Sequence, residues 1–545
     1  MILCILPPAS TYIYSKWMPG GIFVELIKRN IHTDFIKCKA QMQMTLEDDV
    51  IISDSRPDAA KLIMDRGNVI IEEVKVTDDH VGVKGKLAFH VLYLTEDGAA
   101  PLRSDVANME GMIPFDESVF MEGIRAGDSV NVDWELEDLS VSLINSRKLS
   151  VQSVVTLLLS CEEIRDEETA VDLYSEEPVE FRKKSLDIAA MTIKKKDIFR
   201  VKEEVEIPGS FPNIQTMIWA EVVPEAVEFK VLEDKIGVQG ELRAFFLYRG
   251  EGEESEICHY ETTLPFAGSL DCPGAREGMI PEIRFRAEDR EVEVRPDFDG
   301  EERVITFEQC LDLDICIYAE EKIDILSDVY GVVKEVSALE KNADFRRLLS
   351  KSSGKTKLSG HFKCEDDKAV IHKILHTASS LQISSQNATE SGIELTGTVN
   401  MQIFYECSSE ENRYGVIKGA IPFSYVLEAE GIGENCIYPV QSFVDQVTVA
   451  IIDNIEVDVK CVLYFRSNVY LKWQEKIVEQ VIVSEPDMEK MEALPGIAVY
   501  MVKDGESLWD IGKRYYVPVS VIKQTNDLTS DEVKAGDRIL IVKNV

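Results

Sequence analysis

Basic residues are scarce in this 545-residue chain. Lysine and arginine together number 59, against 98 aspartate and glutamate residues, which gives a formal net charge of −39 at pH 7. A surface this acidic repels phosphate backbones and anionic lipid headgroups, so binding to nucleic acid or to an anionic membrane is excluded as a general role. We expect partners that are proteins with basic patches, or neutral ligands.

Long apolar runs are also lacking. The first six residues are apolar, but Pro7 and Pro8 follow them and no basic residue precedes them. A signal peptide needs a basic start and a longer apolar core. Val154–Leu159 is typical of the longest internal runs and is far too short to cross a bilayer. We therefore expect a protein that is neither secreted nor inserted in a membrane.

Clusters of metal-binding or disulfide-forming residues are missing from the sequence. The 11 cysteines are scattered with no Cys-x-x-Cys pair, and the closest two, Cys310 and Cys316, have no clustered histidine beside them. We interpret them as mostly buried, reduced thiols of a cytosolic protein. His372 and His376 are four residues apart, but the chain has only seven histidines and no third ligand is near. We expect neither a metal nor a cofactor.

No constellation of catalytic residues emerges either. Residues 353–356 read Ser-Gly-Lys-Thr, as at the end of a phosphate-binding loop, but Leu349 occupies the position of the first glycine of such a loop and no hydrophobic strand precedes it. The chain contains no Gly-x-Ser-x-Gly sequence. The sequence indicates a protein that is not an enzyme, and we expect it to hydrolyse neither ATP nor peptidoglycan.

What the sequence does contain is a pattern that occurs three times. In each copy a glycine precedes a tyrosine by eight residues, and an Ile/Leu-Pro-Phe sequence follows. Pro57 and Pro212 also precede the first two glycines by 28 residues each. The copies are Gly85, Tyr93 and Ile113-Pro114-Phe115; Gly240, Tyr248 and Leu264-Pro265-Phe266; and Gly397, Tyr405 and Ile421-Pro422-Phe423. These spacings predict three equivalent domains in which the glycines superpose.

The local periodicity within the copies is that of β-strands. Apolar residues alternate with polar ones from Ile455 to Leu463, and shorter alternations occur at Val132–Leu136 and Val292–Val294. Each copy therefore reads as six or more short strands of a mostly antiparallel domain with one buried face. We expect the glycine to mark a bulge or turn that a side chain would obstruct, and the proline to lie at a strand start.

The predicted fold class is mainly β, with three tandem antiparallel β domains followed by a small β-α-α-β domain. Seven basic and seven acidic residues balance from Ile497 to Val545, so the acidic excess lies wholly before that point and marks a boundary. Segments 162–197, 321–360 and 484–496 are predicted to be linkers, the second with helical stretches. The predicted domains are residues 24–165, 196–322, 355–470 and 496–545, after an extension, residues 1–23, that is either untranslated, with Met18 as the start, or disordered.

The most specific signature lies in Tyr500–Ile511, which reads YMVKDGESLWDI. A short strand enters a tight turn, where Gly505 can take backbone angles that other residues avoid. Ser507 is a good N-cap for the helix that follows, and Leu508 and Ile511 recur at helical spacing on its inner face. A second helix and a final strand complete a β-α-α-β unit of about fifty residues.

Residues 497–545 resemble the LysM family along their whole length. The resemblance is carried by the Tyr-x-Val-Lys-x-Gly-Glu-Ser-Leu, Asn-x-Leu and Gly-Asp-x-Ile-x-Ile elements, while Gly512 stands where the family mostly has alanine. It implies a shallow groove that in this family usually binds N-acetylglucosamine in peptidoglycan or chitin. Carried over by position, the groove consists of Asp504, Gly505, Glu506, Ser507 and Leu508, facing Asn526, Asp527 and Leu528. Leu508, Ile511 and the glycines are equally explained as residues that the fold needs.

Trp509 is the last candidate in this region. It lies about 100° round the helix from Leu508, so we expect it to be at least partly exposed beside the groove. Two interpretations stay open. The indole is either an anchor for a partner, since tryptophan is enriched among binding hot spots, or a cover over the edge of the helix.

Tandem β domains ahead of a C-terminal LysM domain resemble the clostridial spore morphogenetic proteins. The segment Glu25–His32 through Pro57 is similar to the start of that family, so the resemblance covers about residues 24–545. It implies a non-enzymatic scaffold of spore coat assembly in the mother-cell cytoplasm, at the forespore surface or in the spore coat. Its LysM domain would bind the coat-basement ATPase, the stage IV A morphogenetic protein. The alternative is a peptidoglycan-binding protein of cortex or cell wall that recognises N-acetylglucosamine.

Overall fold

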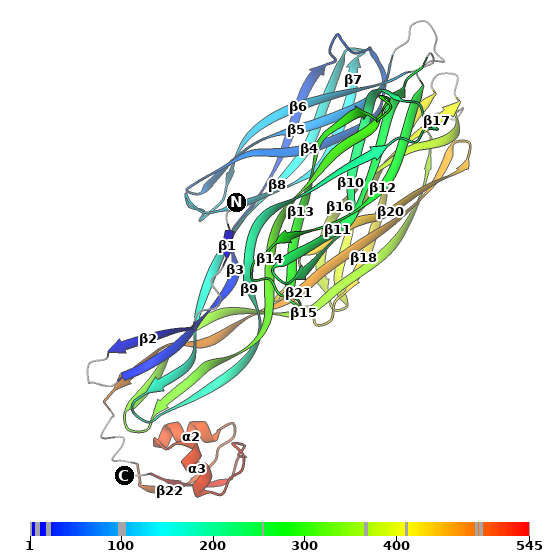
Figure 1. The fold of residues 1–545 in the computed structure, drawn as a ribbon. Helices are drawn as coiled ribbons and strands as arrows, with labels where there is room; N and C mark the ends of the chain where they lie inside the picture. Colours follow the sequence, from blue (N-terminus) through cyan, green and yellow to red (C-terminus); the bar gives the residue numbers. More distant parts are fainter. Residues whose placement is uncertain are drawn as a thin grey trace.

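The computed structural model describes residues 3–5, 11–17, 23–95, 105–252, 256–364, 369–408, 413–485, 489 and 494–543. Within these residues the chain is almost wholly β-strand up to residue 485, and the strand pairs are antiparallel. Three β domains lie at one end of an elongated molecule, a narrower stalk leads away from them, and the small C-terminal module lies at the far end of that stalk (Figure 1). The predicted mainly β fold class is confirmed.

Each repeat is built from six principal strands in the same order. The first repeat has β3 (Phe23–Ile51), β4 (Ala59–Thr77), β5 (His80–Thr95), β6 (Val106–Phe120), β7 (Val130–Asn145) and β8 (Lys148–Ser175). The second has β9 (Val179–Glu206), β10 (Ile214–Leu232), β11 (Lys235–Gly250), β12 (Ile257–Asp271), β13 (Ile280–Pro296) and β14 (Glu302–Gly331). The third has β15 (Glu335–Lys363), β16 (Val370–Thr389), β17 (Gly392–Ser408), β18 (Tyr414–Glu428), β20 (Val440–Asp453) and β21 (Glu456–Ser484), with a short β19 (Cys436–Ile437).

Two sheets face each other in every repeat. The second, third and fourth strands form a meander, as in β4-β5-β6, while the first, last and next-to-last strands pair in the order β3-β8-β7. The orders β10-β11-β12 with β9-β14-β13, and β16-β17-β18 with β15-β21-β20, repeat this plan. Apolar residues at alternate positions fill the space between the sheets, for example Val81 and Val83 of β5 and Val151 and Leu157 of β8.

The three motif glycines occupy equivalent positions, as their spacing predicted. Each lies in the central strand of its meander, opposite the phenylalanine of the Ile/Leu-Pro-Phe sequence. The register pairs are Gly85 with Phe115, Gly240 with Phe266, and Gly397 with Phe423. A Cβ on any of these glycines would lie 2.6–2.9 Å from the phenylalanine ring. The aromatic ring therefore covers the glycine, and both residues are needed for the two strands to pack.

The expectation of a bulge beside each glycine is confirmed, whereas the expectation for proline is wrong. The strand that precedes the glycine strand shifts register next to it, between Ile71 and Glu73 in the first repeat. Pro114 and its equivalents do not begin a strand but lie within β6, β12 and β18. These strands are at the edge of their sheets, where an amide that points away from the sheet has no ladder partner, so proline is tolerated.

The motif tyrosines close each sandwich at one end. The Tyr93 hydroxyl donates a hydrogen bond to the carbonyl oxygen of Pro57 at 3.0 Å, and the Tyr248 hydroxyl donates to that of Pro212 at 3.3 Å. This contact accounts for the matched spacing of the two prolines. In the third repeat, the Tyr405 hydroxyl instead lies 2.6 Å from the Cys364 thiol.

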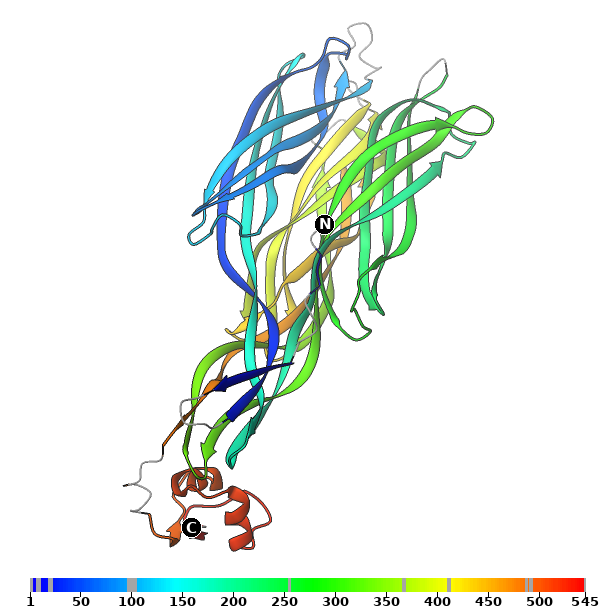
Figure 2. The same ribbon diagram turned by 60° about the vertical axis from the view of Figure 1, so that its left-hand side comes forward.

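Two of the three predicted linkers are wrong. Residues 162–197 lie mostly in β8 and β9, and residues 321–360 lie mostly in β14 and β15, with no helix in the described part of either segment. The outer parts of three long strand pairs, β3–β8, β9–β14 and β15–β21, extend beyond the sandwiches and twist together into the stalk (Figure 2). Their apolar residues share two cores, one containing Leu26, Leu326 and Val478 and the other Ile31, Ile323 and Phe345. High charge made these segments resemble linkers, but alternate residues face a core that only three strand pairs together can close.

The three sandwiches also meet one another through a shared apolar cluster. Each repeat contributes the residue 22 positions before its motif glycine and the residue seven positions after it. These are Ile63 and Leu92, Ile218 and Leu247, and Leu375 and Phe404, all buried in one cluster. The repeats are therefore packed around a common centre, rather than spaced along the chain like beads.

Two short strands precede the first repeat. β1 (Leu3–Ile5) pairs with β9, and β2 (Thr11–Trp17) pairs with the beginning of β3. They belong to the segment 1–23 that was predicted to be an extension. Met18 lies outside the described residues, so the alternative start stays a prediction.

Candidate functional site

The C-terminal module has the predicted β-α-α-β order. β22 (Ile497–Met501) pairs antiparallel with β23 (Arg538–Val542), and α2 (Leu508–Tyr515) and α3 (Val519–Thr525) lie between them in sequence. Both helices pack on one face of the two-stranded sheet. Their shared core contains Val502, Leu508, Ile511, Ile522, Ile539 and Ile541.

The first turn of the module takes the predicted form. Gly505 has a φ of 78°, in the region that side chains disfavour. Ser507 caps α2, because the Asp510 amide donates to its hydroxyl oxygen at 3.3 Å while its own amide donates to the Asp510 carboxylate at 2.9 Å. The predicted N-cap is therefore confirmed, and the side chain of Ser507 is committed to holding the helix start.

The Glu506 carboxylate forms hydrogen bonds with three other groups of the module. It accepts hydrogen bonds from the Tyr500 hydroxyl at 2.7 Å, the Lys503 amide at 3.1 Å and the Arg514 guanidinium at 2.7 Å. The bonds from Tyr500 and Arg514 lower the pKa of Glu506 to about 2. The negative charge at this end of the predicted groove is already neutralised by groups of the same module.

Asn526, on the opposite side of the predicted groove, joins the end of α3 to the last strand. Its amide nitrogen donates to the carbonyl oxygens of Leu540 at 2.7 Å and Ile522 at 2.8 Å, and its amide oxygen accepts from the Leu540 amide at 2.7 Å. Leu508 is 1% exposed in the module core, and Leu528 packs against that core. Of the eight predicted groove residues, Asp504, Gly505 and Asp527 are exposed.

The prediction that Trp509 is at least partly exposed is wrong. Its side chain is 9% exposed, its indole N–H donates to the Asp328 carboxylate at 2.8 Å, and its ring packs edge-on against Tyr330 at a centroid distance of 4.8 Å. Asp328 and Tyr330 lie at the end of β14, at the tip of the stalk. The position of Trp509 on the helix was predicted correctly, but the surface that covers it comes from residues about 180 positions earlier in the chain.

An apolar stripe on the outer face of β22 was not predicted. Ile497 is 69% exposed, Val499 67% and Met501 58%. Their register partners on β23 project to the same face, away from both helices; these are Val542, Leu540 and, opposite Met501, Arg538. The sequence did carry a signal, because every residue of β22 except its core-facing Tyr500 and Ala498 is a large aliphatic one in a strand whose sheet has only two members.

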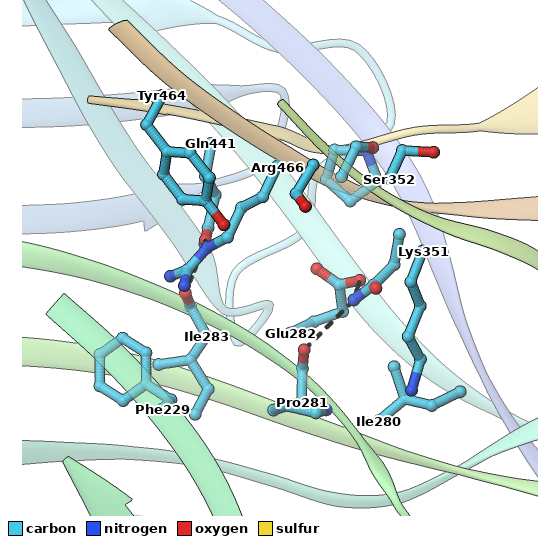
Figure 3. A pocket seen from close by; sticks show the side chains of 14 residues that line it. Phe229, Ile280, Pro281, Glu282, Ile283, Lys351, Ser352, Gln441, Tyr464 and Arg466 are labelled. Atoms are coloured by element: carbon cyan, nitrogen blue, oxygen red, sulfur yellow. Dashed lines mark hydrogen bonds between the residues drawn. The ribbon is translucent and has the colours of Figure 1, made fainter. Parts of the chain in front are cut away.

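A cavity of about 260 Å³ lies between the second and third repeats (Figure 3). Glu282 accepts hydrogen bonds there from the Asn468 amide at 2.6 Å and the Tyr470 hydroxyl at 3.0 Å, and burial raises its pKa. The Arg466 guanidinium donates to the Gln441 amide oxygen at 2.6 Å. The bonds to Glu282 join β13 to β21, and the bond from Arg466 joins β21 to β20. The described residues that line the cavity include no histidine or cysteine. The cavity is thus a polar junction between the second and third repeats.

Other candidate sites from the sequence fall on strands. His372 and His376 are both in β16, as the strand-like sequence around them indicated, and residues 353–356 are in β15. Across the described ranges, no three His, Cys, Asp or Glu side chains gather as a metal ion would require. No helix within the same ranges has the length and apolar character that crossing a membrane requires.

Comparison with protein-family models identifies the repeats and the module. The SPOCS domain model of SipL matches residues 58–144, 213–295 and 370–452, and the LysM domain model matches residues 500–542. No curated protein and no solved structure matches the chain. Both matched families are non-catalytic binding domains. The three SPOCS segments fall on the three sandwiches and the LysM segment on the C-terminal module, so the chain is a sporulation-related LysM protein with tandem SPOCS domains of the SipL type.

Proposed function

We propose that this protein is a non-enzymatic scaffold of spore coat assembly, recruited to the forespore surface by its LysM domain. The partner in this proposal is the coat morphogenetic ATPase, the stage IV A protein. The observation that carries it is the apolar stripe of Ile497, Val499 and Met501, each more than half exposed on the outer face of β22. Burying aliphatic side chains that are gathered on one face of a small domain against another protein removes apolar surface from water, which favours binding.

A protein partner explains this surface better than a sugar does. Sugar hydroxyls need polar groups that are available for hydrogen bonds, and two such groups of the predicted groove, Glu506 and Asn526, are already bonded within the module. An aliphatic stripe of three residues provides no hydrogen-bonding side chains for a sugar, but it provides apolar area that a protein partner can bury. The groove nevertheless retains the exposed Asp504, Gly505 and Asp527, so glycan binding is the alternative that an experiment must distinguish.

The test replaces Val499 with glutamate in the full-length protein. A charge at the centre of the stripe should lower capture of the purified ATPase by about 30-fold or more, which corresponds to about 2 kcal/mol for an interface hot spot. Val74→Glu is the matched control, because Val74 is also an exposed strand valine but lies in the first repeat. Circular dichroism verifies that both variants are folded.

A parallel assay with insoluble peptidoglycan separates the two functions. Full capture of the ATPase by Val499→Glu would contradict the proposed scaffold recruitment. Retention on peptidoglycan, lost when the exposed groove residue Asp527 is replaced by lysine but kept in Val499→Glu, would instead establish the glycan-binding alternative.

A further inference from the structure

The LysM module is joined to the tip of the stalk by a set of specific contacts. Asp328 of β14 accepts hydrogen bonds from the Trp509 indole at 2.8 Å and from the Lys513 ammonium at 2.7 and 2.9 Å. The guanidinium of Arg182, from β9, lies 5.5 Å from the centre of the Trp509 ring. A single acidic residue thus holds two neighbouring side chains of α2, and opposite charges face each other across the contact.

The next residues of the tip reach the turn between the two helices. The Tyr330 hydroxyl donates to the carbonyl oxygen of Val517 at 2.9 Å, and Tyr330 itself is 2% exposed. The Tyr516 hydroxyl donates to the Glu335 carboxylate at the start of β15, at 2.5 Å. The contact therefore combines a buried aromatic ring with satisfied polar groups, which distinguishes it from two surfaces that merely touch.

Gly512 gives an independent indication that the module and the tip fit each other. A Cβ at this position would lie 2.6 Å from the Tyr330 hydroxyl and 2.8 Å from the Val517 carbonyl oxygen. Glycine weakens a helix interior by about 1 kcal/mol relative to alanine, so its presence in an eight-residue helix needs a reason. The missing side chain is the space into which the Tyr330 hydroxyl fits.

The stalk and the apolar stripe lie on different sides of the module. In Figure 1, α2 faces the stalk tip, and β22 lies on the side away from it. The Trp509 side chain is covered, while Ile497, Val499 and Met501 stay exposed. One face of the module is therefore occupied by the chain itself and the other is open.

We infer that the Trp509 face of the LysM module is an internal docking surface whose occupant is the stalk tip formed by β9 and β14. Docking makes the module the fixed end of the stalk and presents the β22 stripe outward. Trp509 then acts within the chain, and a partner protein binds the opposite face. The assignment of the partner protein to the β22 face rests on the proposed function. The docking of the Trp509 face on the stalk tip does not, because it is a contact within the chain.

The test follows the indole N–H signals of the full-length protein by NMR after ¹⁵N labelling of its five tryptophans. Trp509→Phe identifies the signal of Trp509. In the wild-type protein, a soluble gadolinium chelate should leave this signal sharp, because the indole is covered. Asp328→Ala should shift the signal and broaden it in the presence of the chelate. Tyr330→Phe, which removes only the hydroxyl bonded to Val517, should shift it in the same direction.

The matched control is Asp324→Ala, since Asp324 lies in the same strand and its carboxylate accepts a hydrogen bond from the Ser185 hydroxyl of β9. It should leave the Trp509 signal unchanged. A wild-type Trp509 signal that the chelate broadens, or an Asp328→Ala variant indistinguishable from wild type, would overturn the docking.

Capture of the coat ATPase decides the second half of the inference. Asp328→Ala should capture the ATPase within about twofold of wild type, whereas Val499→Glu should lose capture yet keep the Trp509 signal in place. Loss of capture by Asp328→Ala with normal capture by Val499→Glu would place the partner on the Trp509 face and overturn the division. If neither variant affects capture, the proposed recruitment fails while the NMR result still decides the docking.

Discussion

Asn526 and Glu506 show how much a motif residue can do without touching a ligand. Both lie at positions that the LysM resemblance assigns to a groove, and the side chains of both form hydrogen bonds to other groups of the module. Leu508, a third such position, is a core residue. A sequence motif records every residue that a small fold cannot replace, and ligand contacts are only part of that set.

Asn526→Ala should destabilise the module by about 2–4 kcal/mol. The change removes three hydrogen bonds of 2.7–2.8 Å. Two of them are the side-chain bonds that Asn526 makes to the backbone amide and carbonyl of Leu540 in β23. Gln524→Ala, at an exposed position of α3, is the control and should stay within about 0.5 kcal/mol of wild type. Hydrogen exchange of the β22 and β23 amides measures the free energy of opening. Equal exchange in the two variants would show that Asn526 is free to bind a ligand instead.

At the scale of strands and helices, the pairing of a glycine with a phenylalanine defines each SPOCS repeat. The glycine lies opposite a bulge and beneath an aromatic ring, so the spacing between the two residues in sequence is set by the length of one hairpin. This is why a purely numerical pattern predicted a structural equivalence. The same pattern did not predict where the strands end, because the alternation of apolar and charged residues continues far beyond each sandwich.

Gly85→Ala should destabilise the first repeat by about 2–4 kcal/mol. The new Cβ would meet the backbone oxygen of Ile70 at 2.5 Å and the Phe115 ring at 2.6 Å, so one of the two strands must move. Gly82→Ala in the same strand is the control, because its Cβ would have ordinary contacts of 3.7 Å or more. That variant should be neutral or slightly more stable, since alanine restricts the unfolded chain. Urea unfolding monitored by fluorescence compares the two, and equal midpoints would refute the packing role of the glycine.

At the scale of the whole molecule, the repeats form one body. The shared central cluster and the two cores of the stalk each take residues from more than one repeat. Ion pairs also cross between repeats, as between Glu162 of the first repeat and Lys194 and Arg284 of the second, at 2.6 and 3.1 Å. The protein therefore differs from a string of independent binding modules on flexible linkers, and its LysM domain is held at a defined distance from the sandwiches.

A chain shortened to residues 23–331 should not remain a monomer. Loss of the third repeat uncovers Ile63 and Leu92, together with Ile218 and Leu247, and an apolar surface of this kind associates in water. A chain of residues 23–484, which lacks the first 22 residues and the LysM module, keeps the contacts among the three repeats and should stay monomeric. Size-exclusion chromatography with light scattering measures the mass of both. A monomeric, folded 23–331 would show that the repeats are independent domains.

Much of this protein was determined by its sequence alone. The β class, the three equivalent repeats, the N-cap at Ser507 and the β-α-α-β module follow from short-range spacing, because strand alternation, helix periodicity and capping act over a few residues. The stalk and the covering of Trp509 were decided only by the tertiary structure. Leu26, Leu326 and Val478 come from three different strand pairs that share one core. Trp509 is covered by Asp328 and Tyr330 at the end of β14. No local pattern can indicate which surface will be covered when the covering residues lie far away in the sequence, because burial is a property of the assembled fold.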